Sequence, residues 1–261
     1  MSKIRSYKYV KCHFVGLTAD KSTYFSQDRI DVYYGFTRNL LQSENILGKY
    51  LSEKENERKL KFLSPDDCKT YVISHGIMRL ILSFHINSDP EDLSYYYEIN
   101  NKPGIPKNPV FFNLTHTKNA FAIAVTRNHY VGIDLEDIST GIEIKAIARN
   151  YFGPKEREYI FYTEKGAFER FFLIWTRKEA LLKALGTGIV DNLAEISLCD
   201  EENEIDPLIF NNHSNCLISN PEHFLYTKRI LNSYLSVASP QPSEVRYQML
   251  NNKSISKFLN K

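Results

Sequence analysis

The stretch Phe171-Phe-Leu-Ile-Trp-Thr-Arg-Lys-Glu-Ala-Leu-Leu-Lys-Ala-Leu-Gly186 predicts one amphipathic helix, around which the rest of the chain is organised. Its apolar side chains recur at helical spacing, and its second half consists of strong helix formers. Gly186 fits the position just past the helix end, where a positive φ is favoured. Glu179 and Lys183 are four residues apart and therefore share one face of the helix. Taken alone, such a pair is typical of a salt bridge on a solvated surface.

A second stretch, Tyr130-Val-Gly-Ile-Asp-Leu-Glu136, predicts a strand. With a period of two, Asp134 and Glu136 point to the same side, as does Gly132, which leaves room near the backbone. Two like charges side by side repel each other unless a cation lies between them. A solvated strand end is one interpretation. The other is a site for a hard divalent cation, most simply Mg²⁺, which in a site of few carboxylates usually also binds phosphate.

The two stretches together resemble the paired signature of the Sfp-type 4′-phosphopantetheinyl transferase family. That signature is a G-x-D-x-E strand, here Gly132 to Glu136, and then a W-x-x-K-E-A-x-x-K helix, here Trp175 to Lys183. The resemblance implies an α+β fold of two similar halves, related by a pseudo-twofold axis, with the active site at their interface. The halves are expected at residues 1–127 and 128–245. Residues 240–261 are polar and are expected to be loosely held, with residues 246–261 forming a polar C-terminal tail.

Length and composition set broader limits. The 261 residues are 43% apolar, which is enough for one large domain or two ordinary ones. The net charge of +2 gives no case for a general nucleic-acid binder. The polar start, Met1-Ser-Lys-Ile-Arg5, does not resemble a signal peptide, and no apolar run approaches the length of a membrane span. The four cysteines lack C-x-x-C spacing, so we expect reduced thiols in a cytoplasmic protein without membrane or nucleic-acid partners.

Two further segments are similar to the coenzyme A site of the family. Asn101-Lys-Pro-Gly-Ile-Pro106 is a turn-rich loop like the family's G-K-P loop, in which the lysine contacts phosphate, and Lys102 takes that place. Val110-Phe-Phe-Asn-Leu-Thr-His-Thr117 is similar to the F-N-x-S-H-S segment. It implies pyrophosphate contacts for the hydroxyl of Thr115 and, if protonated, for His116. Without the resemblance, an exposed loop lysine and a structural histidine would explain these residues.

The charged segment 50–61 is explained mostly by a solvated helix face. The resemblance places Arg58, four residues before Phe62, at the 3′-phosphate of coenzyme A. Glu55 stands where the family carries another basic residue. Residues 16–50 mix short apolar and polar pieces and are assigned no role.

The next segment, Ser64-Pro-Asp-Asp67, predicts a helix start, because serine caps free N–H groups and proline and aspartate suit the first turn. We expect this helix to run over residues 65–85. Arg79 within it supports the nucleotide pocket or lies on the surface. His75 and His85 are expected to be packing or surface residues.

The resemblance implies a mechanism in which Mg²⁺ bridges the coenzyme A pyrophosphate and three acids, Asp134, Glu136 and Glu179. A serine hydroxyl of an acyl or peptidyl carrier protein attacks the phosphorus, and Glu179, or a metal-bound water beside it, accepts the proton. Lys183 lowers the pKa of Glu179 and, with the cation, stabilises the departing 3′,5′-ADP. The expected catalytic residues are Glu179, Lys183 and Asp134, and the expected cofactor-binding residues are Arg58, Lys102, Thr115, His116, Asp134, Glu179 and Lys183.

Two other classes of function compete with this interpretation. One is a non-catalytic relative that holds coenzyme A or a carrier protein without transfer. The other is a different Mg²⁺-dependent phosphotransfer enzyme, although the chain lacks the G-x-x-x-x-G-K-[ST] loop of the common nucleotide triphosphatases. Two halves in one chain would make a monomer sufficient. Arg177 is a candidate for docking an acidic helix of the carrier.

Overall fold

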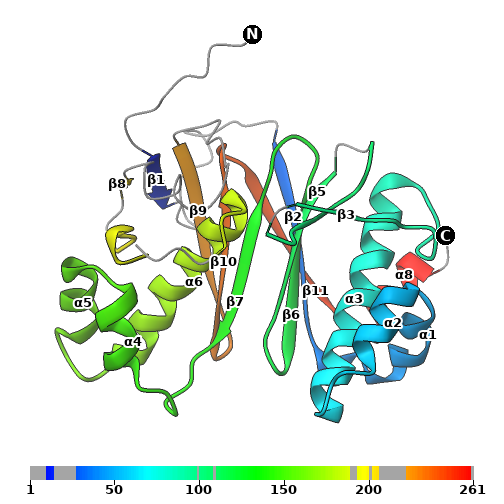
Figure 1. Ribbon diagram of the computed structural model, residues 1–261, viewed down its shortest axis with the longest axis horizontal. Helices are drawn as coiled ribbons and strands as arrows, with labels where there is room; N and C mark the ends of the chain where they lie inside the picture. Colours follow the sequence, from blue (N-terminus) through cyan, green and yellow to red (C-terminus); the bar gives the residue numbers. More distant parts are fainter. Residues whose placement is uncertain are drawn as a thin grey trace, which may run out of the picture.

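Two β-sheets stand side by side in the middle of the molecule, and helices cover the outer face of each (Figure 1). The structure is a computed structural model that describes residues 10–14, 28–98, 100–107, 110–188, 193–199, 202–205 and 222–259. The strands are β1 Val10–Phe14, β2 Arg29–Phe36, β3 Tyr96–Tyr97, β4 Pro103–Gly104, β5 Phe111–His116, β6 Ala120–Thr126, β7 Gly132–Asp137, β8 Glu202–Ile205, β9 Glu222–Ile230, β10 Ser233–Ser239 and β11 Glu244–Leu250. The helices are α1 Glu44–Lys49, α2 Glu53–Lys59, α3 Pro65–Ile86, α4 Ile144–Tyr151, α5 Pro154–Phe161, α6 Ala167–Leu185 and α8 Asn252–Leu259, with 3-10 turns η1 Thr37–Asn39, η2 Leu41–Ser43 and η3 Leu193–Glu195.

The strand orders are β7-β10-β9-β1-β8 in one sheet and β11-β2-β6-β5 in the other, with β3 and β4 forming a separate pair. Helix α6 packs on the first sheet, α4 and α5 pack on α6, and α3 packs on the second sheet (Figure 1). The expected mixed α+β fold is therefore confirmed. The pseudo-twofold relation between two halves stays a prediction.

The buried apolar residues form three cores, because alternate side chains of a strand face opposite sides of its sheet. Between the sheets, Ile133 and Leu135 of β7 pack with residues of β2, β6, β9 and β10. On the outer faces, one core joins α6 to α4 and α5, and another joins α3 to β5 and β6. Because odd-numbered residues of β7 face the core between the sheets, its even-numbered residues face α6.

The two sheets meet along β5 and β7. The side-chain oxygen of Asn113 in β5 accepts a hydrogen bond from the backbone N–H of Ile133 in β7 at 2.9 Å. Phe112, one residue earlier, faces the α3 core instead. Strand β5 thus presents Asn113 and Thr115 to β7, and this seam lies where the active site was expected.

Local signals fix the two long helices. Ser64 caps α3 by accepting a hydrogen bond from the N–H of Asp67, and Pro65 follows in the first turn, as the sequence predicted. Asn87 ends α3 in the left-handed conformation. Helix α6 begins after Gly166 and ends at Gly186, whose φ of 69° is the positive value expected at a glycine stop.

The first and the last described strands each pair with a sheet formed mainly by a distant part of the chain. Strand β1 pairs parallel to β9, and β11 pairs parallel to β2, so β11 lies beside β2 in Figure 1. Helix α8 then packs on α3, with Leu250 and Ile255 buried. The loosely held tail expected for residues 246–261 is therefore wrong over residues 246–259, because a parallel strand and buried apolar side chains anchor them. The boundary expected between residues 127 and 128 falls in the turn between β6 and β7 and stays a prediction.

None of the helices in the described ranges is long and apolar enough to cross a membrane.

Candidate active site

The backbone of α6 lies directly against Gly132 at the start of β7. A Cβ at Gly132 would stand 2.0 Å from the carbonyl oxygen of Ala180 and 2.2 Å from the amide nitrogen of Ala184. No side chain fits there, because real atoms do not approach so closely. The sequence predicted free space beside Gly132, and the structure fills that space with the helix. This contact brings the face of α6 that carries Glu179 and Lys183 onto the acidic side of β7.

Asp134, Lys183 and Thr115 form a compact cluster at the seam. The ammonium of Lys183 donates to Oδ1 of Asp134 at 2.6 Å and to the hydroxyl of Thr115 at 3.3 Å. The Thr115 hydroxyl in turn lies 3.3 Å from the same carboxylate oxygen. Asp134 is 3% exposed, so the solvated strand end is wrong for this residue. The ion pair between Lys183 and Asp134 crosses from α6 to β7 rather than running along the helix.

Glu136 and Glu179 add two further carboxylates beside this cluster. Burial, and then repulsion by Asp134, raises the pKa of each from about 4.5 to about 7. Lys183 lowers both pKa values, as expected, but does not offset burial. Glu136 also accepts a hydrogen bond from the side chain of Trp175. The site therefore holds three acids against one lysine, and the excess negative charge is poorly solvated.

The donor set fits a hard divalent cation. Oδ2 of Asp134 and Oε1 of Glu179 are buried and accept no hydrogen bond from any described residue. Such carboxylate oxygens are the ligands that Mg²⁺ prefers. Among the residues that the structure describes, no three His, Cys, Asp or Glu side chains already converge as a metal-ligand set. The ligand set Asp134, Glu136 and Glu179 therefore stays a prediction, supported by the chemistry of its donors.

Basic and aromatic groups lie on the other side of the seam. His116 ends β5, and its pKa is lowered chiefly by partial burial and further by the charges of Lys183 and Arg58. The expected protonated form is therefore disfavoured until an anion binds nearby. Arg58, in α2, places its guanidinium 5.8 Å from the ring centre of Tyr71 in α3. Lys183 and Arg58 thus both come within electrostatic range of His116, although the three residues come from different elements.

Lys102 reaches the site in a way that the sequence did not predict. Its ammonium donates to the carbonyl oxygens of Lys183 at 2.6 Å, of Val131 at 3.2 Å and of Ala184 at 3.3 Å. Carbonyls at a helix C-terminus lack intrahelical donors and carry partial negative charge. Lys102 therefore fastens the end of α6 to the start of β7. Its expected contact with phosphate stays a prediction.

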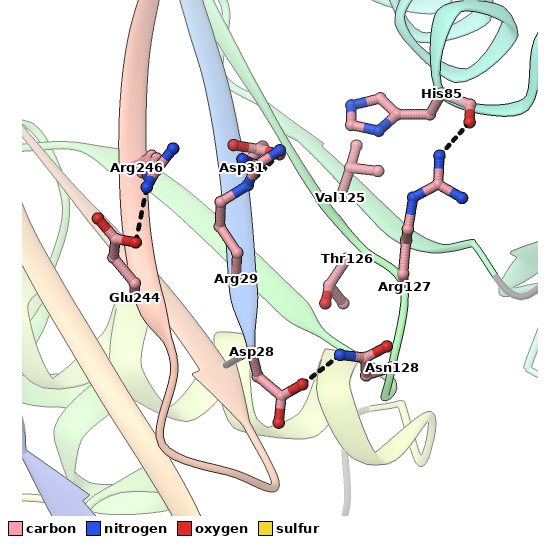
Figure 2. A pocket seen from close by; sticks show the side chains of 10 residues that line it. All are labelled: Asp28, Arg29, Asp31, His85, Val125, Thr126, Arg127, Asn128, Glu244 and Arg246. Atoms are coloured by element: carbon pink, nitrogen blue, oxygen red, sulfur yellow. Dashed lines mark hydrogen bonds and ion pairs between the residues drawn. The ribbon is translucent and has the colours of Figure 1, made fainter. Parts of the chain in front are cut away.

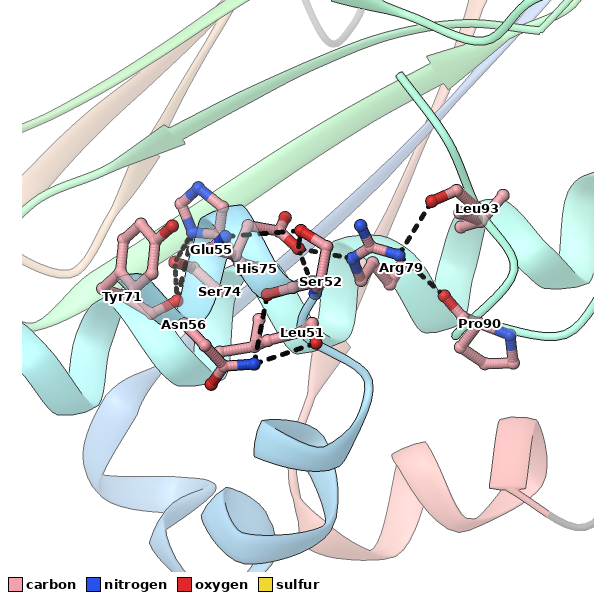
Figure 3. A network of polar contacts seen from close by, with 10 residues as sticks. All are labelled: Leu51, Ser52, Glu55, Asn56, Tyr71, Ser74, His75, Arg79, Pro90 and Leu93. Carbon is pink, nitrogen blue, oxygen red and sulfur yellow. Dashed lines mark hydrogen bonds and ion pairs between the residues drawn. The ribbon is translucent and has the colours of Figure 1, made fainter. Parts of the chain in front are cut away.

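Figure 3 explains the acidic residue at position 55. Glu55 accepts from the guanidinium of Arg79 at 2.7 Å and closes a capping box with Ser52. Arg79 is 1% exposed and also donates to the carbonyls of Pro90 and Leu93. The surface alternative for Arg79 is therefore wrong, and Glu55 ties α2 to α3 instead of facing a phosphate. His75 packs against Tyr71, as expected for a packing residue, with ring centres 4.0 Å apart.

A separate pocket of ≈360 Å³ lies beyond the C-terminal end of α3 (Figure 2). It is lined by charged side chains that mostly pair with one another, such as Arg29 with Asp31 and Arg246 with Glu244. Arg127 donates to the carbonyl oxygen of His85 at 2.5 Å. Because the opposite charges are matched, this pocket makes no case for a highly charged ligand.

Two contacts in and beside the site were missed by sequence reasoning. The hydrogen bond from Trp175 to Glu136 joins the first residue of one motif to the last of the other. The buried ion pair between Lys178 and Glu156 lies on the opposite side of α6. Arg177, expected to be a docking residue, instead donates to Thr227 and to the carbonyl of Leu198. The spacing of the W-x-x-K-E-A-x-x-K motif could have assigned Trp175, Arg177 and Lys178 to different faces of α6. The partners of these three residues, however, depend on tertiary contacts.

Comparisons with known proteins point to one family. A family model described as the 4′-phosphopantetheinyl transferase superfamily matches residues 130–227. The 4′-phosphopantetheinyl transferase HetI of Nostoc sp. is 32% identical over 58% of this chain and 66% of its own length. The 4′-phosphopantetheinyl transferase gsp of Aneurinibacillus migulanus is 30% identical over 56% and 60%. The 4′-phosphopantetheinyl transferase Sfp of Bacillus subtilis is 25% identical over 66% and 82%. The chain thus spans less than two thirds of the length of HetI and gsp.

Replacing Gly132 by alanine should separate α6 from β7. We expect Gly132→Ala to lower the free energy of unfolding by about 3 kcal/mol or more, because the added methyl group overlaps helix backbone that cannot rotate away. Gly141→Ala is the matched control, since the nearest atom to its Cβ would be the Ser139 hydroxyl at 3.7 Å. Chemical denaturation of both variants measures the difference. Equal stability of the two would contradict the close contact.

The acid cluster should make the metal-free protein less stable as pH rises. The folded pKa values of Glu136 and Glu179, about 7, lie above their ordinary 4.5, so the folded state binds more protons between these values. Stability from this source is present below pH 4.5 and is lost as pH rises to 7. We expect a loss of up to about 3 kcal/mol for each of the two groups, measured by denaturation in chelator.

The double variant Glu136→Gln/Glu179→Gln should flatten this pH dependence, because neither amide titrates. Glu169→Gln, on the same helix, should leave it unchanged. An unaltered slope in the double variant would refute the assignment.

Proposed function

Because part of the chain matches the 4′-phosphopantetheinyl transferase superfamily and several of its members, we propose that it transfers the 4′-phosphopantetheine arm of coenzyme A to a carrier protein. The acceptor is a serine hydroxyl of an acyl or peptidyl carrier, and 3′,5′-ADP is released. The observation that carries the proposal is the buried cluster of Asp134, Lys183 and Thr115, with unsatisfied carboxylate oxygens beside it. This cluster places anionic ligands for a cation next to cationic ligands for phosphate.

Asp134, Glu136 and Glu179 would hold the Mg²⁺ ion. When bound, the cation neutralises their excess charge and that developing on the pyrophosphate during transfer. The donors suit this role because two of their oxygens have no hydrogen-bond partner among the described residues and because burial makes an unpaired carboxylate unfavourable. Asp134 is the fixed member of the set, since Lys183 and Thr115 orient it.

Lys183 is the principal cationic ligand for phosphate in this proposal. Its side chain is 30% exposed, so the ammonium can reach a bound anion while it stays within 2.6 Å of Asp134. Thr115 adds a hydroxyl donor, and His116 adds a ring whose pKa rises when an anion binds. Arg58 carries the more distant 3′-phosphate, and Lys102, fastened to the end of α6, contributes positive charge near the pyrophosphate.

Glu179 is the proposed general base. A base works best when its pKa lies near the operating pH, and burial places the pKa of Glu179 at about 7. Its Oε1 has no donor among the described residues and is therefore available to accept the serine proton. Burial raises the pKa of Asp134, and the charge of Lys183 and its hydrogen bond oppose that shift.

The alternative is a relative that binds coenzyme A or a carrier protein without transfer. The presence of all three acids argues against it, since binding alone needs no group with a pKa near 7. We further propose a cytoplasmic monomer with no membrane or nucleic-acid partner, because the two sides of the seam come from one chain and the net charge is only +2.

A carrier assay tests the proposal. Incubation of an apo-carrier with coenzyme A and Mg²⁺ should add the mass of one phosphopantetheine arm, and a chelator should stop the reaction. Glu179→Gln should reduce the rate by roughly 10²–10⁴-fold, because it removes the base and a metal ligand. Glu169→Gln on the same helix should transfer normally. Coenzyme A binding without turnover on any carrier would favour the non-catalytic alternative, and normal transfer by Glu179→Gln would refute the assigned base.

A further inference from the structure

A second ionic cluster lies on the face of α6 turned away from the acids. The ammonium of Lys178 is 2.7 Å from Oε2 of Glu156, and both side chains are 0% exposed. The same ammonium stands 5.0 Å from the ring centre of Phe152. No part of the proposed chemistry uses this pair, although Lys178 directly precedes Glu179.

Lys178 connects α6 to three other segments. Its ammonium donates to the carbonyl oxygen of Tyr151 at the end of α4 at 2.9 Å and to that of Leu193 in η3 at 2.8 Å. Its third contact is Glu156 in α5. One helical side chain therefore sets the position of α6 against the whole outer layer.

Glu156 is fixed equally well. Oε2 accepts from the N–H of Gly153 at 2.9 Å, and Oε1 accepts from the N–H of Leu198 at 2.8 Å. Burial raises the pKa of Glu156 and lowers that of Lys178, while each partner's charge opposes the shift. Directional hydrogen bonds therefore hold both side chains of the pair. Rotation of either side chain would break several of these bonds at once.

Stability alone is a poor reason for such a pair. A buried ion pair contributes little compared with apolar side chains of similar volume, whereas breaking it is strongly destabilising. Its directional contacts can instead select one rotation and one axial position of a helix. Consecutive residues of an α-helix project about 100° apart, so fixing the direction of Lys178 also fixes that of Glu179.

The opposite face of α6 tolerates little displacement. At Gly132 the helix backbone leaves no room for a Cβ, so α6 is fixed on one side by that contact and on the other by Lys178. Lys183, one turn beyond Glu179, must reach Asp134 at 2.6 Å from this position. A displacement of about 1 Å at a reacting centre can reduce a rate by roughly 10²-fold.

We infer that Glu156 and Lys178 form a positioning pair, which holds α6 in the rotation that points Glu179 and Lys183 at Asp134. The inference rests on the proposed function for its catalytic consequence, but its structural consequence does not depend on transfer. The pair acts through Glu179 and Lys183 and touches neither substrate nor metal.

The test uses the full chain and the double variant Glu156→Gln/Lys178→Met. This variant removes both charges together and leaves no unpaired buried ion. Glu156→Asp keeps the charge opposite Lys178 but shortens its reach by one methylene, so it serves as the milder variant if the double variant does not fold. Ile255→Ala is the stability control, because Ile255 is 1% exposed in α8 and lies outside the α6 core.

We expect the folded double variant to bind Mg²⁺ with coenzyme A at least 10-fold more weakly by calorimetry. Its kcat should fall about 10- to 100-fold while KM for the carrier stays within 2-fold, and Glu156→Asp should show a smaller change in the same direction. Ile255→Ala should retain the wild-type binding and kcat at temperatures where it is folded.

Crystal structures give a readout that does not depend on activity. In the double variant, or in Glu156→Asp if only that variant folds, the contact between Lys183 and Asp134 should lengthen beyond 3.5 Å. A contact of unchanged length, with binding and kcat within 2-fold of wild type, would overturn the inference. A wild-type protein that transfers to no carrier would instead refute the proposed function, and the Lys183–Asp134 distance would still decide the role of the pair.

Discussion

The absence of a side chain at Gly132 is the constraint on which the site depends. Because Gly132 has no Cβ, the backbone of α6 approaches β7 closely enough for Lys183 to reach Asp134. The strand contributes its acids from the even-numbered face, and the helix supplies Glu179 and Lys183 from the facing turns. Neither element alone holds both charges of the cluster.

Burial then changes the pKa values of the acids at this contact. Asp134 is almost inaccessible to solvent, and Glu136 and Glu179 are sufficiently desolvated that their pKa values rise toward neutrality. A single lysine does not balance three acids, so the arrangement favours binding a further cation or retaining protons. The same unbalanced charge would be unremarkable on a solvated surface, because water would screen it.

Local patterns were sufficient to predict some elements and not others. Helix α6 and strand β7 could be predicted because apolar spacing and Gly186 are local signals. Strand β2 could not, since its buried residues do not alternate, and β11 has a mostly exposed pattern and a partner at the other end of the chain. The acids could be predicted from the resemblance, whereas the roles of Lys102 and Glu55 depend on tertiary contacts that no local pattern contains.

The most direct measurement is a crystal structure of the protein with Mg²⁺ and coenzyme A bound. The account predicts that oxygens of Asp134, Glu136 and Glu179 and of the pyrophosphate lie about 2.1 Å from one shared ion, with the Lys183 ammonium on a neighbouring phosphate oxygen. A structure in which the ion and the pyrophosphate lie elsewhere, and these three acids share no ligand, would contradict it.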